Sequence, residues 1–353
     1  MTEPPRVSTG PRAVSWDEHR KGHERRCCSV EVLRILEPRR SRPVNTPHTP
    51  DRGHPDSDRV LIEERGPLNN LAYRLLGSLT EAEDAVQEAY ARWYALSLEQ
   101  QTAIASPGAW LNTVVSRICL DVLRSTRVRR EQYVGEWLPE PLPDGREWSG
   151  RETGHPSGDP ADRITLDESV DMAFLVVLES LAPAERVAFL LHDVFRYPFA
   201  EVAEIVGRKP GACRQLASRA RRRIRDAQHT AVPAYRRAAI IGDFKRAWEA
   251  KDIETLVELL DPTATIIADG GGRASASPVP IEGGNTVAAF LVGLAEHAEG
   301  HALLERSVNG QPGLVGTDGT RIETVFSFEI ADDRITRIWA VRNPEKLQPW
   351  SDR

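Results

Sequence analysis

The sequence predicts a multidomain protein in which two all-α modules are followed by an α+β domain. A chain of 353 residues is too long for one ordinary hydrophobic core. Apolar residues recur with the helical period in two separate blocks, and after Val232 the pattern changes to one helix followed by strand-like segments. The predicted parts are an N-terminal extension, a first helical module, a linker, a second helical module and a C-terminal domain, with the bounds 1–58, 59–135, 136–160, 161–228 and 229–353.

The N-terminal extension, residues 1–58, has the composition of a disordered segment. It contains eight prolines, scattered charges and no apolar periodicity, so it offers too little apolar surface to offset the entropy lost on ordering. An alternative is that translation starts near Val60, because the only methionines are Met1 and Met172.

The bulk composition is that of a soluble intracellular protein. The apolar fraction of 40% and the charged fraction of 28% are ordinary for globular chains. The four cysteines show no metal-ligand spacing, and a reducing cytoplasm fits them best. No run approaches the roughly 18 apolar residues that a membrane span needs, and the start lacks the apolar core of a signal peptide. We therefore expect a cytoplasmic protein without metal, cofactor or membrane partner.

Two helices are expected in the first helical module. Thr80–Glu83 has the form of a capping box, so the first helix should run from there to Tyr94 and expose an acidic face. Ser106–Pro107 opens a second helix with one apolar face. Its other face and its C-terminal end carry the polar and basic residues Asn112, Arg117, Arg124, Arg127, Arg129 and Arg130. Such faces are more often plain solvated surfaces than binding sites.

The second helical module has the pattern of a helix-turn-helix unit. A short helix from Phe199 to Val206 is ended by Gly207, and a longer helix follows Lys209–Pro210. Residues 210–225 hold six arginines and no acidic residue, whereas an ordinary solvated face mixes charges of both signs. This excess favours DNA binding, with Gln215, Ser218 and Arg219 as candidates for base-edge contacts and Arg221, Arg222, Arg223 and Arg225 for phosphate contacts. The candidate contacts are Arg214, Gln215, Ser218, Arg219, Arg222 and Arg223.

The C-terminal domain is expected to begin with a helix around Phe244–Leu260. Farther on, Thr324–Ile330 and Ile335–Val341 flank the polar pair Asp332–Asp333, which is the pattern of a β-hairpin. Residues 235–353 contain 13 Lys and Arg against 18 Asp and Glu. This negative balance makes the domain a poor DNA-binding module.

Three segments of the first helical module resemble region 2 of extracytoplasmic-function (ECF) sigma factors. They are Leu71–Gly77, Ala82–Glu88 and Ala109–Leu111, and they occur in the order of the family. The second helical module is similar to region 4. The resemblance implies a protein that binds core RNA polymerase, recognises the −10 and −35 promoter elements and initiates transcription. It also implies that the basic helix of the first module forms the −10 surface and that the helix-turn-helix reads the −35 element and touches the β flap. The implied contacts with the clamp helices of the largest polymerase subunit are Glu83, Asp84, Gln87 and Glu88.

Three further motifs resemble signatures of the sigma-factor subgroup with a SnoaL-like C-terminal extension. They are Trp137–Pro141, Asp269–Arg273, with Arg where Lys is usual, and Asn343–Leu347. The resemblance implies that the C-terminal domain is a cone, in which a curved antiparallel sheet wraps around helices and encloses a pocket. We expect the motifs to set the orientation of the two sigma modules and so to regulate activity in cis. The expected regulatory residues are Trp137, Leu138, Pro139, Asp269, Gly270, Gly271, Gly272, Arg273, Asn343, Pro344, Lys346 and Leu347.

Two other functions compete with this interpretation. An isomerase or cyclase with a cone fold needs a carboxylate or imidazole with a perturbed pKa. The available groups are Asp243, Asp252, Asp269, His297 and His301. Their spacing along the sequence places no pair of them together, so we expect none of them to be catalytic. A helix-turn-helix regulator with a ligand-binding cone would not need the acidic helix. A small-molecule ligand in the cone stays open.

Overall fold

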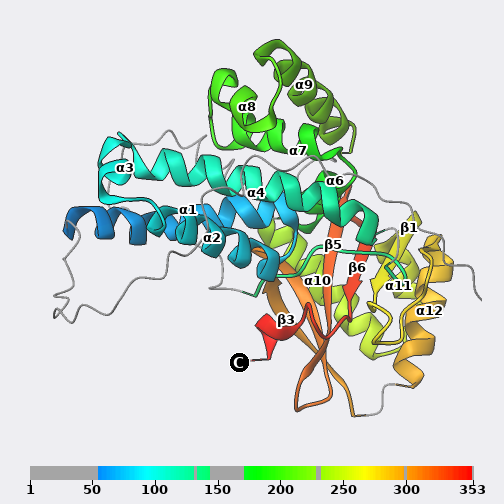
Figure 1. Ribbon diagram of the computed structural model, residues 1–353. Coiled ribbons are helices and arrows are strands. Elements are labelled where there is room, and N and C mark those ends of the chain that lie inside the picture. Colours follow the sequence, from blue (N-terminus) through cyan, green and yellow to red (C-terminus); the bar gives the residue numbers. More distant parts are fainter. Residues whose placement is uncertain (1–54, 131–132, 144–170, 228–231, 298–299, 352–353) are drawn as a thin grey trace, which may run out of the picture. The chain divides into compact units, whose positions relative to one another are not determined.

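The computed structural model describes residues 55–130, 133–143, 171–227, 232–297 and 300–351 (Figure 1). All of them belong to one compact unit, Arg52–Arg353. The predicted disordered extension lies outside the described residues up to residue 54, and its last four residues are the start of the first helix. Linker residues 144–160 and residues 161–170 of the predicted second helical module also lie outside them. No helix of the described part is long and apolar enough to cross a membrane.

The first helical module is built from three helices that pack pairwise and a short fourth one. Trp93 and Trp110 meet edge to face in its core, with ring centroids 5.3 Å apart. The predicted capping box at Thr80 is wrong, because Gly77 at φ +68 ends the preceding helix and Ser78 caps the next. The Ser78 side chain accepts the Glu81 backbone amide at 3.3 Å, which leaves Thr80 inside the helix. The helices are α1 (Pro55–Leu76), α2 (Leu79–Tyr94), α3 (Leu98–Ala103) and α4 (Pro107–Arg130).

The second helical module contains the predicted helix-turn-helix as α8 and α9. Gly207, in the left-handed conformation with φ 72, ends α8 as predicted. The apolar residues of α9 recur with the helical period and are all buried: Cys213, Leu216, Ala217, Ala220 and Ile224. The helices are α6 (Met172–Glu179), α7 (Pro183–Phe189), its π-helical continuation η2 (Leu190–Val194), α8 (Phe199–Val206) and α9 (Pro210–Ala227).

The two helical modules share one hydrophobic core. Leu75 and Val115 of the first module and Leu190 and Leu216 of the second belong to the same buried cluster. Arg186 is buried at the contact, where its Nη1 donates to the Leu75 carbonyl at 2.9 Å. Burial lowers the pKa of the Arg186 guanidinium to about 9. The modules therefore behave as one packed body in this structure.

The C-terminal domain is a six-stranded sheet with helices on one face, and its sheet order is β2-β1-β6-β5-β4-β3. The expectation of a fully antiparallel sheet is wrong, because β1 and β6 pair in parallel while the other pairs are antiparallel. A connection that includes α12 and four strands, β2 to β5, separates β1 from β6 along the chain, so no hairpin joins them. The elements are α10 (Ala234–Glu249), α11 (Ile253–Leu259), β1 (Leu260–Asp269), β2 (Ile281–Glu282), α12 (Gly284–Glu296), β3 (Ala302–Val308), β4 (Gln311–Thr317), β5 (Ile322–Ala331), β6 (Arg334–Val341) and η3 (Gln348–Trp350).

The single helix predicted around Phe244–Leu260 is two helices. Lys251 has a φ of 57 and leaves the helical conformation after α10. Asp252 then caps α11, since its carboxylate accepts the Thr255 backbone amide at 3.1 Å. The predicted hairpin is confirmed: β5 and β6 pair antiparallel around Asp332–Asp333, whose φ angles of 49 and 62 suit a two-residue turn.

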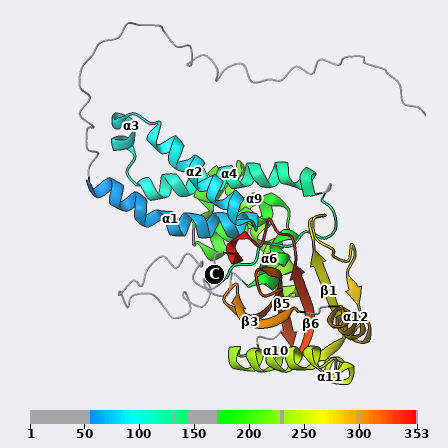
Figure 2. The ribbon, with the colours of Figure 1, turned by 90° about the horizontal axis from the view of Figure 1, so that it is seen from below.

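The sheet packs on both faces. On one face, β5 carries Phe326 and Phe328 against Trp248 and Phe244 of α10, with ring centroids 5.3 and 5.4 Å apart. On the other face, Trp339 belongs to a cluster with residues of the linker, α6 and η3. Figure 2 shows α10 and α11 on one side of β5 and β6, and α6 on the other. The sheet thus carries the linker and the second helical module on the face that its own helices leave uncovered.

Candidate functional site

The acidic face of α2 is exposed. Ala82, Ala85, Val86 and Ala89 point into the core, and the four residues expected to bind a partner are on the opposite, exposed face: Glu83, Asp84, Gln87 and Glu88. Within that face, Arg92 Nε lies 2.9 Å from Glu88 Oε1. The face is therefore accessible in this structure and carries net negative charge.

The polar face of α4 lies next to α8. Arg117 Nη2 donates to the Glu204 carbonyl of α8 at 3.2 Å. Asn112 donates its amide to the Gly108 carbonyl of its own helix at 2.9 Å, and Arg124 pairs with the neighbouring Asp121 at 3.2 Å. The side chains of Arg127, Arg129 and Arg130, at the end of α4, lie outside the described part. The described candidates therefore contact protein groups of α4 and α8.

The six candidates on α9 are all exposed: Arg214, Gln215, Ser218, Arg219, Arg222 and Arg223. Two of them are anchored on α7, where the buried Glu185 lies 2.9 Å from Arg219 Nε and 3.4 Å from Arg223 Nη1. The Arg214 guanidinium lies over the Phe199 ring, 5.6 Å from its centroid. The exposed face of α9 is thus strongly basic, and part of it is oriented by contacts within the module.

The three motifs of the linker, β1 and the C-terminal tail meet around the carboxylate of Asp269. Asp269 is fully buried at the end of β1. Its Oδ1 accepts the Tyr133 hydroxyl at 2.6 Å and the Gly271 backbone amide at 3.0 Å. Its Oδ2 accepts the Leu138 backbone amide at 2.9 Å and the Lys346 ammonium at 2.7 Å. We call this contact the linker joint, formed by Tyr133, Trp137, Leu138, Asp269, Gly271, Asn343 and Lys346.

Lys346 connects the tail to both other segments. Its buried Nζ also donates to the Leu138 carbonyl at 2.5 Å. The same ammonium lies 4.0 Å from the centroid of the Trp137 ring and 5.2 Å from that of Tyr133. The charge is therefore matched by a carboxylate, a carbonyl and two aromatic faces.

Tyr133 is a member of the joint that the sequence motifs did not include. Its hydroxyl accepts the Asn343 amide at 2.9 Å while it donates to Asp269. Burial raises the pKa of Tyr133, and its hydrogen bond to Asp269 raises it further. Gly271, with φ +58, packs so closely that a Cβ there would clash with the Asn343 amide. The positive φ and the close approach of Asn343 explain why this position of the motif is a glycine.

The other motif residues occupy the edge of the joint. Arg273 and Glu345 form an exposed ion pair of 2.7 Å. Gly272 has a φ of +69 and lies against Val134, and Gly270 would clash with the Ala274 carbonyl if it carried a Cβ. Pro344 is exposed. The side chains of Leu138 and Leu347 are buried on the sheet beside Trp339, and Pro139 is buried as well.

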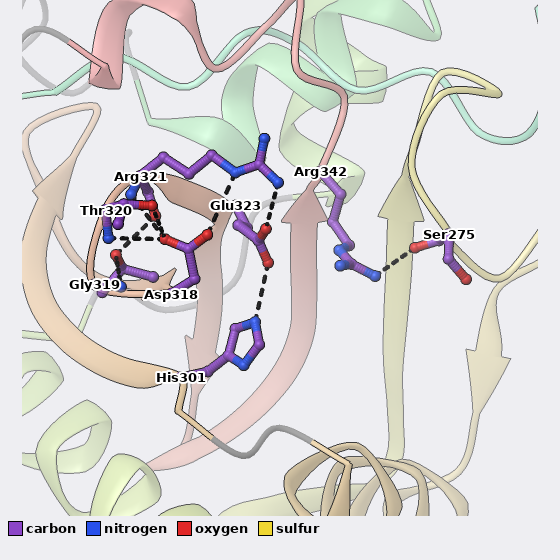
Figure 3. Close-up of polar contacts among 9 residues, drawn as sticks. Ser275, His301, Asp318, Gly319, Thr320, Arg321, Glu323 and Arg342 are labelled. Atoms are coloured by element: carbon purple, nitrogen blue, oxygen red, sulfur yellow. Dashed lines mark hydrogen bonds and ion pairs between the residues drawn. The ribbon is translucent and has the colours of Figure 1, made fainter.

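The titratable groups considered for catalysis lie apart. Asp243 is exposed beside Arg246, and Asp252 is the cap of α11. His297 contacts its own helix, whereas His301 lies 3.2 Å from Glu323 on the sheet (Figure 3). Asp269 belongs to the linker joint. Among the described residues, no group of three or more His, Cys, Asp or Glu could hold a metal ion.

Comparison with known proteins found two matching family models, similar sequences and a similar crystal structure. The family model "Sigma-70 region 2" matches residues 61–129, and "Sigma-70, region 4" matches residues 171–224. The chain is 39% identical over 296 residues to the ECF RNA polymerase sigma factor SigJ of Mycobacterium tuberculosis, covering 80% of this chain and 90% of that protein. It is 34% identical over 287 residues to the probable ECF sigma factor SigI of the same species, covering 81% and 92%. The crystal structure of SigJ superimposes with a TM-score of 0.63 at 35% identity, covering 83% of this chain and 98% of that chain.

Proposed function

Because this chain belongs to the ECF sigma factor family, we propose that it directs core RNA polymerase to promoters and that its C-terminal domain restrains the two sigma modules in cis. In this proposal the acidic face of α2 binds the clamp helices of the largest subunit. The polar face of α4 binds the −10 element. The basic face of α9 binds the −35 element, and the second module touches the β flap. The exposure of Glu83, Asp84, Gln87 and Glu88 and the arginines of α9 support these roles.

The observation that carries the cis regulation is the linker joint. The linker leaves the first module after α4 and passes Lys346 and Asp269 before it reaches the second module. The start of the linker is held on the C-terminal domain, because the Leu138 backbone binds both members of this buried ion pair. The second module is held there as well, since Met172 of α6 is buried in the same cluster as Trp339 of β6. The C-terminal domain therefore limits how far the modules separate.

Promoter binding requires that separation. The centres of the −10 and −35 elements are roughly 25 base pairs apart, which is about 85 Å along B-DNA. In this structure α4 and α8 are in contact, and Arg117 binds the Glu204 carbonyl. This contact supports the proposal that the described conformation is a restrained state, in which the two modules do not bind both elements at once.

The proposed function makes no use of catalysis. The relatives that the chain matches are sigma factors, and the aromatic rings of Phe244, Trp248, Phe326 and Phe328 pack against one another between α10 and β5. We propose that the C-terminal domain is a scaffold for the linker. Its aromatic rings pack between α10 and β5, and its motif residues bind the linker at the linker joint.

The test is run-off transcription with core RNA polymerase, comparing the full chain with its Lys346→Met variant. Lys245→Met is the matched control, because Lys245 forms its ion pair with Glu249 within α10 and is not a member of the linker joint. We expect specific initiation by the full chain and more transcript from Lys346→Met, with Lys245→Met unchanged. Equal yields from all three would contradict the restraint. No initiation from any of them, with DNA bound in the absence of polymerase, would leave a ligand-responsive DNA-binding regulator.

A further inference from the structure

Asn309, the first residue of the β3–β4 turn, is buried, which is unusual for a turn of this sequence. Asn309 and Gly310 have φ angles of 53 and 72, as in the two-residue turns that Asn-Gly favours. Such turns normally lie in solvent, and the β4–β5 turn of this domain does: Asp318 accepts the backbone amides of Thr320 and Arg321 and contacts residues of its own turn (Figure 3). Asn309, in contrast, has an exposed fraction of 1%. Its side chain therefore faces another part of the protein.

Asn309 joins the C-terminal domain to the linker and to α1. Its Nδ2 donates to the Tyr73 hydroxyl at 2.9 Å. Its Oδ1 accepts the Leu142 amide at 3.1 Å, and its own amide donates to the Leu142 carbonyl at 2.8 Å. All these contacts are buried. The turn thus fixes both the linker and the end of α1.

Glu140 is the next residue in this network. The Tyr73 hydroxyl donates to the Glu140 carbonyl at 2.6 Å, and the Glu140 amide donates to the Gly77 carbonyl at 2.8 Å. The backbone of Glu140 is therefore held from both sides at the corner between α1 and α2.

The Glu140 carboxylate caps α2. Its Oε2 accepts the backbone amide of Leu79, the first residue of the helix, and its Oε1 accepts the Ser78 hydroxyl, both at 2.7 Å. The first amides of a helix have no partner within the helix, and negative charge at this end is stabilising. Burial raises the pKa of Glu140, and the bonds from Ser78 and Leu79 oppose that shift. We call these residues the cap network: Tyr73, Ser78, Leu79, Glu140, Leu142 and Asn309.

We propose that Glu140 is a positioning residue for the polymerase-binding face of α2, and that Asn309 holds it in place, so that the C-terminal domain supports polymerase binding through the cap network. The proposal rests on the proposed sigma function. The binding face begins at Glu83, one turn after the capped amide, so fraying of the first turn displaces it. The C-terminal domain then has two opposite effects: the linker joint restrains the modules, and the cap network orders the surface that meets polymerase.

The experiment measures the affinity of the full chain for core RNA polymerase together with hydrogen exchange of the α2 amides. The variants are Glu140→Ala, Tyr73→Phe and Asn309→Gly, since glycine tolerates the positive φ of the turn. Asp318→Gly is the matched control, because it removes an equivalent side chain from the exposed β4–β5 turn. Loss of a helix cap predicts binding about three- to tenfold weaker for Glu140→Ala, and a smaller loss for the other two. Exchange should accelerate at residues 79–83 and stay unchanged in α4.

Two results would overturn the proposal, and a third would refute the proposed function. Variants that bind as tightly as the Asp318→Gly control would overturn the proposal, and so would weaker binding without faster exchange at residues 79–83. A parent chain that does not bind core RNA polymerase would refute the proposed function itself. Faster hydrogen exchange throughout α4 would reveal that Glu140→Ala does not fold. In that case Tyr73→Phe and Asn309→Gly still test the proposal.

Discussion

Lys346 Nζ lies 2.7 Å from Asp269 Oδ2, and both groups are almost completely shielded from solvent. Removing one member of a buried pair leaves the other charge without compensation, which costs much more than an exposed pair contributes. The pair is also where the linker, β1 and the tail meet. The pair is therefore one of the contacts that hold the linker on the C-terminal domain, together with those of Leu142 and Asn309.

Lys346→Met should lower the free energy of unfolding by about 3–5 kcal/mol. The Lys346→Met/Asp269→Asn double variant should lose less than the sum of the two single variants, because neither then leaves a lone buried charge. Urea denaturation of the four proteins measures this. Additive losses would show that the two groups do not interact.

Tyr133→Phe should change the response of stability to alkaline pH. The folded protein holds the Tyr133 proton more tightly than the unfolded chain, because the pKa is raised in the folded state. The contribution of this group is complete below pH of about 10 and is lost as the pH rises further. Between pH 10 and 11, the stability of the parent should therefore fall more steeply than that of Tyr133→Phe. Chemical denaturation across this range gives both slopes, and parallel slopes would contradict the assignment.

Gly271→Ala should destabilise the linker joint by about 1–3 kcal/mol, through left-handed strain and a clash with the Asn343 amide. Gly319→Ala is the control, since Gly319 also has a positive φ but no atom lies within 4 Å of the position that a Cβ would take. The difference between the shifts in thermal unfolding midpoint of the two variants measures the cost of the clash with the Asn343 amide alone. Equal shifts would attribute the whole effect to backbone strain.

Arg219→Ala and Arg222→Ala should affect promoter binding differently. Arg219 is oriented by Glu185 and is assigned to base edges, so its loss should relax the sequence preference within the −35 element. Loss of a phosphate contact at Arg222 should weaken all sequences about equally and reduce the salt slope by about one. Holoenzyme binding to a panel of −35 variants at several salt concentrations separates these effects. The same pattern from both variants would contradict the assignment.

The parts of the fold that depend on local pattern could be predicted from the sequence. The buried face of α9 follows the helical period, and the β5–β6 hairpin follows from alternating residues around Asp332–Asp333. The break between α10 and α11 was missed because a lysine in the left-handed conformation at Lys251 leaves no sequence signal. The roles of Tyr133 and Asn309 were missed for another reason: their partners lie 136 and 236 residues away along the chain. The local sequence around a polar residue does not indicate a partner that lies so far away along the chain.

The position of the tail motif along the chain has a consequence during protein synthesis. The α9 helix is complete at Ala227, but the linker joint requires Asn343 and Lys346, more than 100 residues later. At ordinary rates of translation, the ribosome needs on the order of 6–23 s to add that stretch. During this interval both sigma modules exist on the nascent chain without the lysine that later fixes the linker. Under the proposed cis restraint, a newly made molecule thus passes through an unrestrained period until Asn343 and Lys346 have been added.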